Sequence, residues 1–158
     1  MLTIAFKEWA VICAALAAGR QSLILRKGGI AEEGGQFRPE HDRFLLYPTY
    51  FHEHRAGIKS EFLPLLEQCE KEKPRAGTVR FTHYVEVASV EHITELEKAL
   101  ALDAQHAWTK EEVTKRFNYR KPGLFALHVR VFALSDLVEV SERPEYAGCK
   151  TWVHLIND

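Results

Sequence analysis

The first hydrophobic run of the chain has the spacing of a helix. Its large apolar side chains recur every three or four residues, and most of the positions between them are small. Thr3 can cap this segment and Gly19 can end it, so the pattern predicts a largely buried helix over residues 4–18. The apolar positions that carry the pattern are Phe6, Trp9, Ala10, Cys13, Leu16 and Ala17.

A strand, a long loop, a second strand and a helix are predicted next. Residues 21–26 favour a strand, and two glycine pairs indicate a loop over residues 28–38. Residues 44–47 form a short strand candidate that Pro48 closes. Ser60 then begins another helix. The apolar face of that helix consists of Phe62, Leu65, Leu66 and Cys69.

The second half of the chain changes to a hydrophobic period of two, which is typical of strands. Alternation over residues 78–87 and, most clearly, over residues 124–134 predicts two strands, and residues 138–140 and 151–156 predict two more. Two helices are expected between residues 94 and 117, each opened by a capping box. The two boxes are Thr94 with Glu97 and Thr109 with Glu112.

These elements predict an α+β fold. We expect a small mixed or antiparallel sheet of about six strands, open or partly closed into a barrel, with helices at the connections. The chain of 158 residues has the length of one domain, so a single domain over residues 1–158 is expected. One shared core should contain Trp9, Phe125, Leu127, Val129 and Val131.

Charge and cysteine content narrow the class of protein. The 21 basic residues nearly balance the 22 acidic ones, which excludes a histone-like polycation and still allows a local basic face. Three widely spaced cysteines lack the spacing of a metal or redox motif and fit a reduced, cytoplasmic protein. The apolar run at residues 10–18 is shorter than the roughly 20 residues of a membrane span, so no membrane partner is expected. A buried helix explains that run better than a signal peptide.

A glycine-rich basic segment is the first candidate for binding. A strand that ends in two cations and two glycines can present backbone N–H groups and positive charge to a phosphate, although no nucleotide-binding motif is matched. The alternative is a glycine turn with exposed cations. The candidate phosphate-binding residues are Arg26, Lys27, Gly28, Gly29, Arg43 and Lys59. Arg26, Lys27 and at least two of Arg38, Arg43, Arg55 and Lys59 should share one continuous surface.

A histidine-rich segment is the candidate for a metal. Imidazole and carboxylate groups are natural zinc ligands, and His41, His52 and His54 with Glu53 offer both. His52 and His54 share a face only if the segment is extended, and Glu53 would then point away. We therefore expect a hydrogen-bonded polar loop with no metal and no cofactor. A metal-dependent hydrolase or nuclease that uses these residues is the alternative.

Two further groups carry candidate chemistry. His128 and Arg130 lie on the second face of the clearest strand, where they either line a pocket or meet solvent. Cations alternate with aromatic residues between His106 and Lys121, a pattern that suits single-stranded nucleic acid but more often marks a solvated helix face. No nucleophile elbow or nuclease metal motif is present.

Three parts of the chain resemble a known prokaryotic family. The family is domain-of-unknown-function family 1802. The resemblance lies in residues 25–30 with Phe37, in residues 43–49 with His41 and His52, and in the ending Tyr146-x-Gly148-Cys149-x-x-Trp152-Val153. The resemblance covers nearly the whole chain but implies no activity. Some members occur with Mrr-like restriction endonuclease domains, which implies a role in restriction–modification and an endonuclease subunit as partner.

A weaker likeness concerns the fold. Residues 79–90, a helical insert and residues 124–140 resemble the PUA-like barrels, a group that includes the ASCH and EVE domains. Members of this group bind RNA or modified DNA bases, so the likeness implies DNA or RNA as partner. The leading hypothesis is a nucleic-acid-binding accessory module that senses DNA or a modified base. Its pocket would be bounded by exposed members of the set Trp9, Tyr47, Tyr50 and Trp108. A pure protein-interaction domain is the third alternative.

Overall fold

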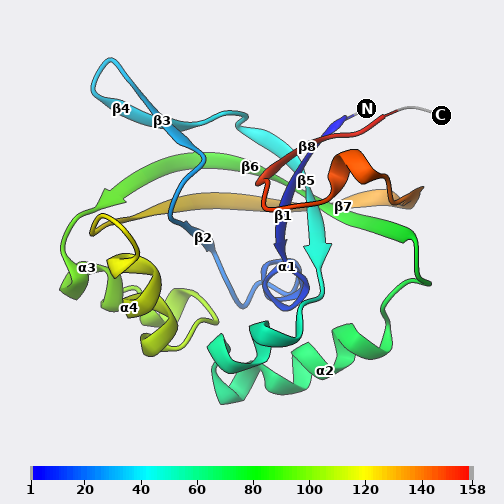
Figure 1. Cartoon of the computed structure of the whole chain (residues 1–158), viewed down its shortest axis with the longest axis horizontal. Helices are drawn as coiled ribbons and strands as arrows, with labels where there is room; N and C mark the ends of the chain where they lie inside the picture. Colours follow the sequence, from blue (N-terminus) through cyan, green and yellow to red (C-terminus); the bar gives the residue numbers. More distant parts are fainter. Residues whose placement is uncertain (1, 157–158) are drawn as a thin grey trace.

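A six-stranded mixed sheet forms the body of the molecule (Figure 1). The computed structural model describes residues 2–156. The sheet has the strand order β2-β7-β6-β5-β1-β8, and its one parallel pair among the described residues is β1 with β5. Its strands are β1 (Ile4–Trp9), β2 (Leu23–Arg26), β5 (Arg43–Thr49), β6 (Thr78–Ile93), β7 (Leu124–Ser141) and β8 (Trp152–His154). The predicted α+β class with a mixed sheet is confirmed.

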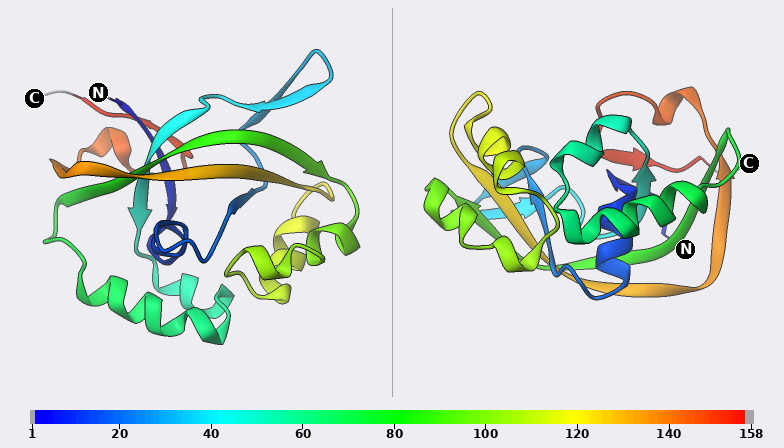
Figure 2. Two further views of the ribbon diagram at one scale, coloured as in Figure 1. Left: turned by 180° about the vertical axis from the view of Figure 1, so that it is seen from behind. Right: turned by 90° about the horizontal axis from the view of Figure 1, so that it is seen from below.

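Helices at the strand connections cover the sheet on one side, as the views from behind and from below show (Figure 2). The α-helices are α1 (Ala10–Ala17), α2 (Leu63–Lys71), α3 (Leu96–Leu100) and α4 (Lys110–Asn118). The 3-10 helices are η1 (His52–Gly57), η2 (Ser60–Phe62), η3 (Asp103–Gln105) and η4 (Pro144–Tyr146). No helix in the part of the chain that the structure describes combines the length and the hydrophobicity needed to cross a membrane.

The helix predicted over residues 4–18 is wrong in its first six residues. Residues 4–9 form β1, which lies between β5 and β8 and pairs with both, and the helix begins only at Ala10. β1 has neighbours on both edges and buried residues on both faces. Phe6 and Trp9 are therefore both buried at a spacing of three residues, which periodicity cannot distinguish from a helix.

The loop predicted over residues 28–38 is also wrong, because most of it forms a separate hairpin. Strands β3 (Ile30–Glu33) and β4 (Gln36–Pro39) pair antiparallel around Gly34 and Gly35, whose φ angles are 56° and 80°. A two-residue hairpin turn with positive φ at both positions strongly favours glycine, and Gly34-Gly35 meets that need. The hairpin projects away from α2 and α4 (Figure 1).

The strands predicted over residues 78–87 and 124–134 are confirmed and are longer than expected, whereas the strand predicted over residues 151–156 is shorter, since β8 spans only Trp152–His154. Residues 138–140 continue β7 instead of forming a strand of their own, so β6 and β7 make one ribbon of 16 and 18 residues. Strand β5 likewise extends past Pro48 to Thr49.

The two predicted capping boxes have different outcomes. The Thr109 hydroxyl accepts a hydrogen bond of 3.1 Å from the Glu112 N–H and caps α4 as expected. The Thr94 cap is wrong, because α3 begins only at Leu96 and its N-cap residue is Glu95, which makes no side-chain capping bond.

Two hydrophobic clusters use opposite faces of the sheet. Ala5 and Phe6 are neighbours on β1, and successive side chains of a strand point to opposite faces. Phe6 belongs to the larger cluster, which the helices cover, and Ala5 belongs to the smaller one with Tyr146. The predicted shared core is confirmed: Trp9 and Leu127 are buried in the larger cluster, and three partly buried residues pack against it. These three are Phe125, Val129 and Val131.

Candidate nucleic-acid interface

The β3–β4 hairpin overhangs a large open cleft, called the hairpin cleft below. Its volume is about 1270 Å³, and its walls come from the hairpin, the β4–β5 connection, the start of β5 and residues 87–90 of β6. Phe37 fixes the hairpin to the sheet, because its ring lies 4.7 Å from the His92 ring and 5.3 Å from the Phe125 ring, centroid to centroid. Polar lining residues are Gln36, Arg38, Glu40, His41, Asp42, Arg43 and Ser89.

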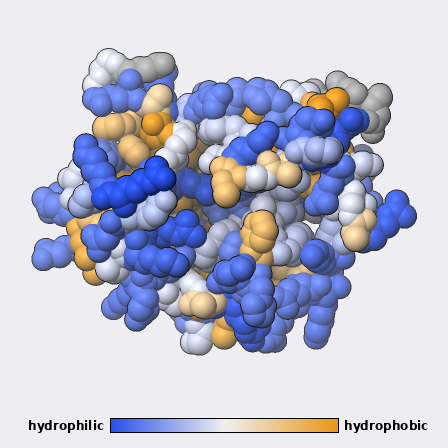
Figure 3. All heavy atoms as spheres, viewed as in Figure 1, coloured by the Kyte–Doolittle hydropathy of each residue, from blue (hydrophilic) through white to orange (hydrophobic). Residues whose placement is uncertain are grey.

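Two of the predicted cations line this cleft. The Arg38 side chain is exposed and donates a hydrogen bond of 3.3 Å to the Gln36 amide oxygen. Arg43 pairs with Glu86 at 3.5 Å, lies 5.0 Å from the centre of the Tyr84 ring and is half exposed. Gly29, with a φ of 81°, lines the same cleft. The face shown in Figure 3 is mostly hydrophilic, and its hydrophobic residues form small separate groups.

Arg26, the first residue of the predicted basic motif, points into the molecule. Its guanidinium donates a hydrogen bond to the Lys7 carbonyl, lies 4.3 Å from the centre of the Phe6 ring and stands 3.8 Å from the Glu8 carboxylate. About a quarter of the side chain is exposed. Arg26 thus joins β2 to β1.

Lys27 and Lys59 use their ammonium groups to hold backbone carbonyls. Lys27 Nζ donates to the carbonyls of Phe117 and Gly123 at 2.7 and 2.8 Å, and also to that of Lys121. Lys59 Nζ is arranged in the same way. It donates to the carbonyl of His106 at 2.7 Å and to that of Asp103, and it pairs with the Asp103 carboxylate at 3.3 Å.

The contacts of these residues do not support the prediction of one continuous basic surface, which stays a prediction. Arg26 and Lys27 are adjacent, but their side chains contact different elements, β1 for Arg26 and the α4–β7 connection for Lys27. Arg55 pairs with Glu67 of α2 at 2.9 Å, on the side of the molecule opposite the hairpin that carries Arg38 (Figure 1). A role for the motif in phosphate binding stays a prediction, and Gly28, which is exposed, belongs to it.

The other predicted polar pair lies outside the hairpin cleft. His128 is half-buried and its Nε2 lies 3.4 Å from the Glu91 carboxylate. Arg130 is exposed on the same ribbon. The sequence left open whether these residues line a pocket or meet solvent, and Arg130 meets solvent.

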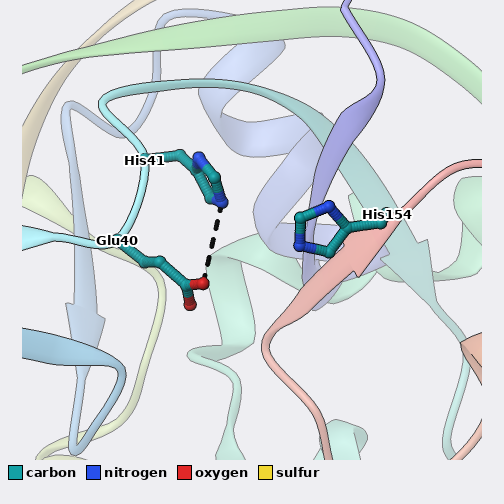
Figure 4. Close-up of side chains that lie close together, drawn as sticks. All are labelled: Glu40, His41 and His154. Atoms are coloured by element: carbon teal, nitrogen blue, oxygen red, sulfur yellow. Dashed lines mark ion pairs between the residues drawn. The ribbon is translucent and has the colours of Figure 1, made fainter.

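The predicted trio of histidines does not converge. His52 and His54 lie on η1, a 3-10 helix and not an extended segment, and the His54 ring stacks on Trp9. His41 lies elsewhere, with Glu40 and His154 (Figure 4). The alternative metal set of His41, His52 and His54 is therefore wrong, because His52 and His54 do not lie beside His41.

The aromatic residues expected at a pocket are mostly core residues. Trp9, Tyr47 and Trp108 are each less than one-tenth exposed. Tyr50 and the exposed Phe51 instead line a second, smaller hollow of about 300 Å³ between the end of β5 and α2.

A buried polar centre lies beneath α1, and the sequence did not single it out. Glu8, Gln21, His106 and Trp108 line a space that is too narrow to hold a water molecule. Gln21 is fully engaged, since its amide donates to the Leu23 carbonyl at 2.8 Å and accepts from the Ala107 N–H at 3.1 Å.

Several nitrogen atoms at this centre have no partner in the structure. These are His106 Nε2, Trp108 Nε1 and, beside Glu8, Arg26 Nε. Burial raises the pKa of the Glu8 carboxyl, and the nearby Arg26 opposes this shift. Burial also lowers the pKa of His106 to about 4. Because the space admits no ligand without movement of its walls, we assign the centre a structural role.

The residues that sequence reasoning missed are those that meet across the fold. Glu8 was hidden in a predicted helix, and Glu40 and His154 gave no local signal because they come together only through the sheet. The one available hint of a buried polar group was Glu8 itself, an acidic residue within a predicted, largely buried helix.

Comparisons with known proteins show the family of the chain and a solved structure with a similar fold. The model of a family described as a domain of unknown function, DUF1802, matches residues 5–158. No curated protein matches the chain.

Solved structures that resemble the chain include two crystal structures of ASCH from Zymomonas mobilis. The first has a TM-score of 0.50 and 9% sequence identity, and the match covers 80% of this chain and 66% of the other. A serine-to-alanine mutant of the same protein gives a TM-score of 0.47 with the same identity and coverage. At this identity the likeness concerns the fold alone. The chain therefore belongs to the DUF1802 family, and its fold is the ASCH-like, PUA-like one that the sequence had suggested.

Proposed function

We propose that this protein is a nucleic-acid-binding module that holds a single strand of DNA or RNA in the hairpin cleft. The observation that carries the proposal is the cleft itself, which has two arginines on its walls and an open side. Its volume of about 1270 Å³ exceeds the roughly 300–1,000 Å³ of ordinary small-molecule pockets, which favours a segment of a polymer.

Arg38 and Arg43 are the residues assigned to phosphate. The exposed guanidinium of Arg38 bonds to a neutral amide, that of Gln36, so a phosphate can replace that contact at little cost. Arg43 can turn from Glu86 to a phosphate because its side chain is half exposed. Phe37 and His41 line the cleft and carry rings on which bases could stack.

Acidic neighbours set an upper limit on the affinity. Glu40 and Asp42 lie on the same wall and oppose a polyanion. We therefore expect modest affinity that depends on about two phosphate contacts. For a single strand, two contacts correspond to a slope of about −1.4 in a plot of log K against log salt concentration.

The test is a titration of fluorescent single-stranded DNA, single-stranded RNA and duplex DNA at several salt concentrations. Arg38→Ala with Arg43→Ala should reduce the single-strand affinity and bring the salt slope close to zero. Arg55→Ala is the matched control, since Arg55 is an exposed, paired arginine on the opposite side. Absence of binding, or equal binding by the double variant, would contradict the proposal and favour a pure protein-interaction domain.

The finer features of the hypothesis are parts of the same proposal. Sensing of a modified base predicts a difference between modified and unmodified strands of one sequence in that titration. A role beside a restriction endonuclease predicts a complex with such a subunit. Free thiols at Cys13, Cys69 and Cys149 support a place in the reducing cytoplasm.

A further inference from the structure

Three potential metal ligands meet at one end of the hairpin cleft. Glu40 and His41 belong to the β4–β5 connection, and His154 is the last residue of β8 (Figure 4). One ligand atom from each side chain lies within 4.8 Å of the other two.

The sheet explains why residues so far apart in sequence come together. β1 pairs with β5 along one edge and with β8 along the other, and Ile4 of β1 lies opposite His154. Trp152 and His154, two residues apart on β8, share a face. The His41 ring contacts both of these rings edge-on, with centroid distances of 5.1 Å to Trp152 and 5.6 Å to His154.

Neighbours in sequence can both point at one metal here because the chain is not extended. A strand would send Glu40 and His41 to opposite faces. The structure instead has a bend at Glu40 between β4 and β5, and both side chains turn towards His154 (Figure 4).

The His41 imidazole has a nitrogen free to act as a ligand. His41 Nε2 is a buried atom with no hydrogen-bond partner, and the Glu40 carboxylate stands 3.8 Å from it, beyond hydrogen-bond range. A buried nitrogen atom of this kind is uncommon in folded proteins and calls for a physical explanation.

We propose that Glu40, His41 and His154 bind a divalent transition metal, with zinc as the best match. Two imidazoles and one carboxylate form a zinc ligand set that leaves the fourth position open. Bond lengths of about 2.0–2.2 Å place tetrahedral ligand atoms about 3.4 Å apart, so the site needs only small side-chain rotations. Glu40 is 60% exposed and free to make them.

The open fourth position would face the hairpin cleft, because Glu40 and His41 line it. A bound cation would also offset the acidic wall formed by Glu40 and Asp42. Metal binding does not depend on nucleic-acid binding, however, and is measured with the metal alone.

The test is calorimetric titration of zinc chloride into metal-stripped protein without a histidine tag, with the melting temperature and the visible spectrum of the cobalt(II) form as second readouts. We expect one zinc per chain, a higher melting temperature with zinc, and the absorption of a four-coordinate cobalt site. Glu40→Gln, His41→Gln and His154→Ala should each weaken binding at least about tenfold.

His52→Ala is the matched control, because His52 is an exposed histidine on η1 outside the group. It should bind zinc as the unaltered protein does. Equal binding by His154→Ala, loss of binding in His52→Ala, or no stoichiometric binding at all would overturn the assignment. Circular dichroism of each variant distinguishes loss of a ligand from loss of the fold.

Discussion

The indole of Trp9 lies flat against the imidazole of His54, with 4.0 Å between ring centroids and 12° between ring planes. Arg116 adds a cation 5.9 Å from the Trp9 ring. Burial, and then the Arg116 charge, lower the pKa of His54 to about 4. The folded protein therefore holds this ring neutral, and the stack joins η1 to the end of β1.

The first prediction concerns the acid sensitivity of that stack. Because the pKa of His54 is about 4 when folded and about 6.5 when unfolded, its contribution to stability is complete above pH 6.5 and is lost as the pH falls towards 4. His54→Phe keeps a flat ring and should remove this part of the acid dependence, as measured by urea unfolding from pH 7.5 to pH 4. The exposed His52→Phe should leave the dependence intact, and equal pH profiles for His54→Phe and the unaltered protein would contradict the assignment.

The second prediction is that ionisation of Glu8 lowers the stability of the fold as the pH rises, whereas His54 lowers it as the pH falls. Burial raises the pKa of Glu8 above its unfolded value, so ionisation of this group in the folded state lowers stability as the pH rises through and above about 4.5. Glu8→Gln keeps an acceptor for the Trp9 N–H, whose bond to Glu8 is 2.8 Å long. The variant should gain stability over the unaltered protein at pH 7 and lose that advantage near pH 4. A larger loss at pH 7 than at pH 4 would show that the ion pair with Arg26 outweighs burial.

Two glycines offer a test of packing with an internal control. A Cβ atom at Gly57 would stand 3.0 Å from Glu112 Cδ and 3.1 Å from the Trp9 ring, whereas one at Gly28 would meet nothing within 4 Å. Gly57→Ala should therefore reduce the free energy of unfolding by about 1–3 kcal/mol, the usual cost of overpacking. Gly28→Ala should change it little, and equal effects of the two substitutions would show that the contacts at Gly57 relax freely.

Lys27 should stabilise the fold through its three carbonyl contacts. Lys27→Met keeps much of the aliphatic stem but leaves the carbonyls of Phe117, Lys121 and Gly123 without their donor. We expect a loss of about 1–3 kcal/mol in the free energy of unfolding. Lys115→Met, an exposed lysine on α4, is the control. A Lys27→Met protein with normal stability but weaker nucleic-acid binding would instead support the phosphate role predicted from sequence.

Sequence reasoning located the elements whose patterns have a single explanation. Residues 124–134 alternate along a ribbon, and Thr109 precedes Glu112 at the spacing of a cap, so each pattern points to one structure. Residues 4–9 and the hairpin strands did not have this property. β1 is buried on both faces, so its apolar residues do not alternate with polar ones, and β3 has the sequence Ile-Ala-Glu-Glu, which does not alternate either.

The candidate site was harder to predict because its contacts are long-range. Closeness in sequence suggested a basic surface, but a lysine side chain is long enough to reach carbonyls from another part of the fold, as Lys27 does. His41 was recognised as a ligand candidate, while its partner His154 lies on the far side of β1. Pairing of this kind is decided by sheet topology, which local patterns do not encode.

The β6–β7 ribbon has a consequence for how the molecule unfolds. Val79 and Phe81 at the start of β6 belong to the smaller cluster, and Val85 and Ile93 further along belong to the larger one. One strand pair thus runs through both clusters, with irregularities in its register between Phe81 and His83 and between Val87 and Ser89. If one cluster opens and β6 separates from β7, the other cluster loses part of the sheet on which its side chains pack. An intermediate with only one folded cluster is therefore unstable. The two cores consequently behave as one cooperative unit, and amide hydrogens at both ends of the ribbon exchange through the same global opening.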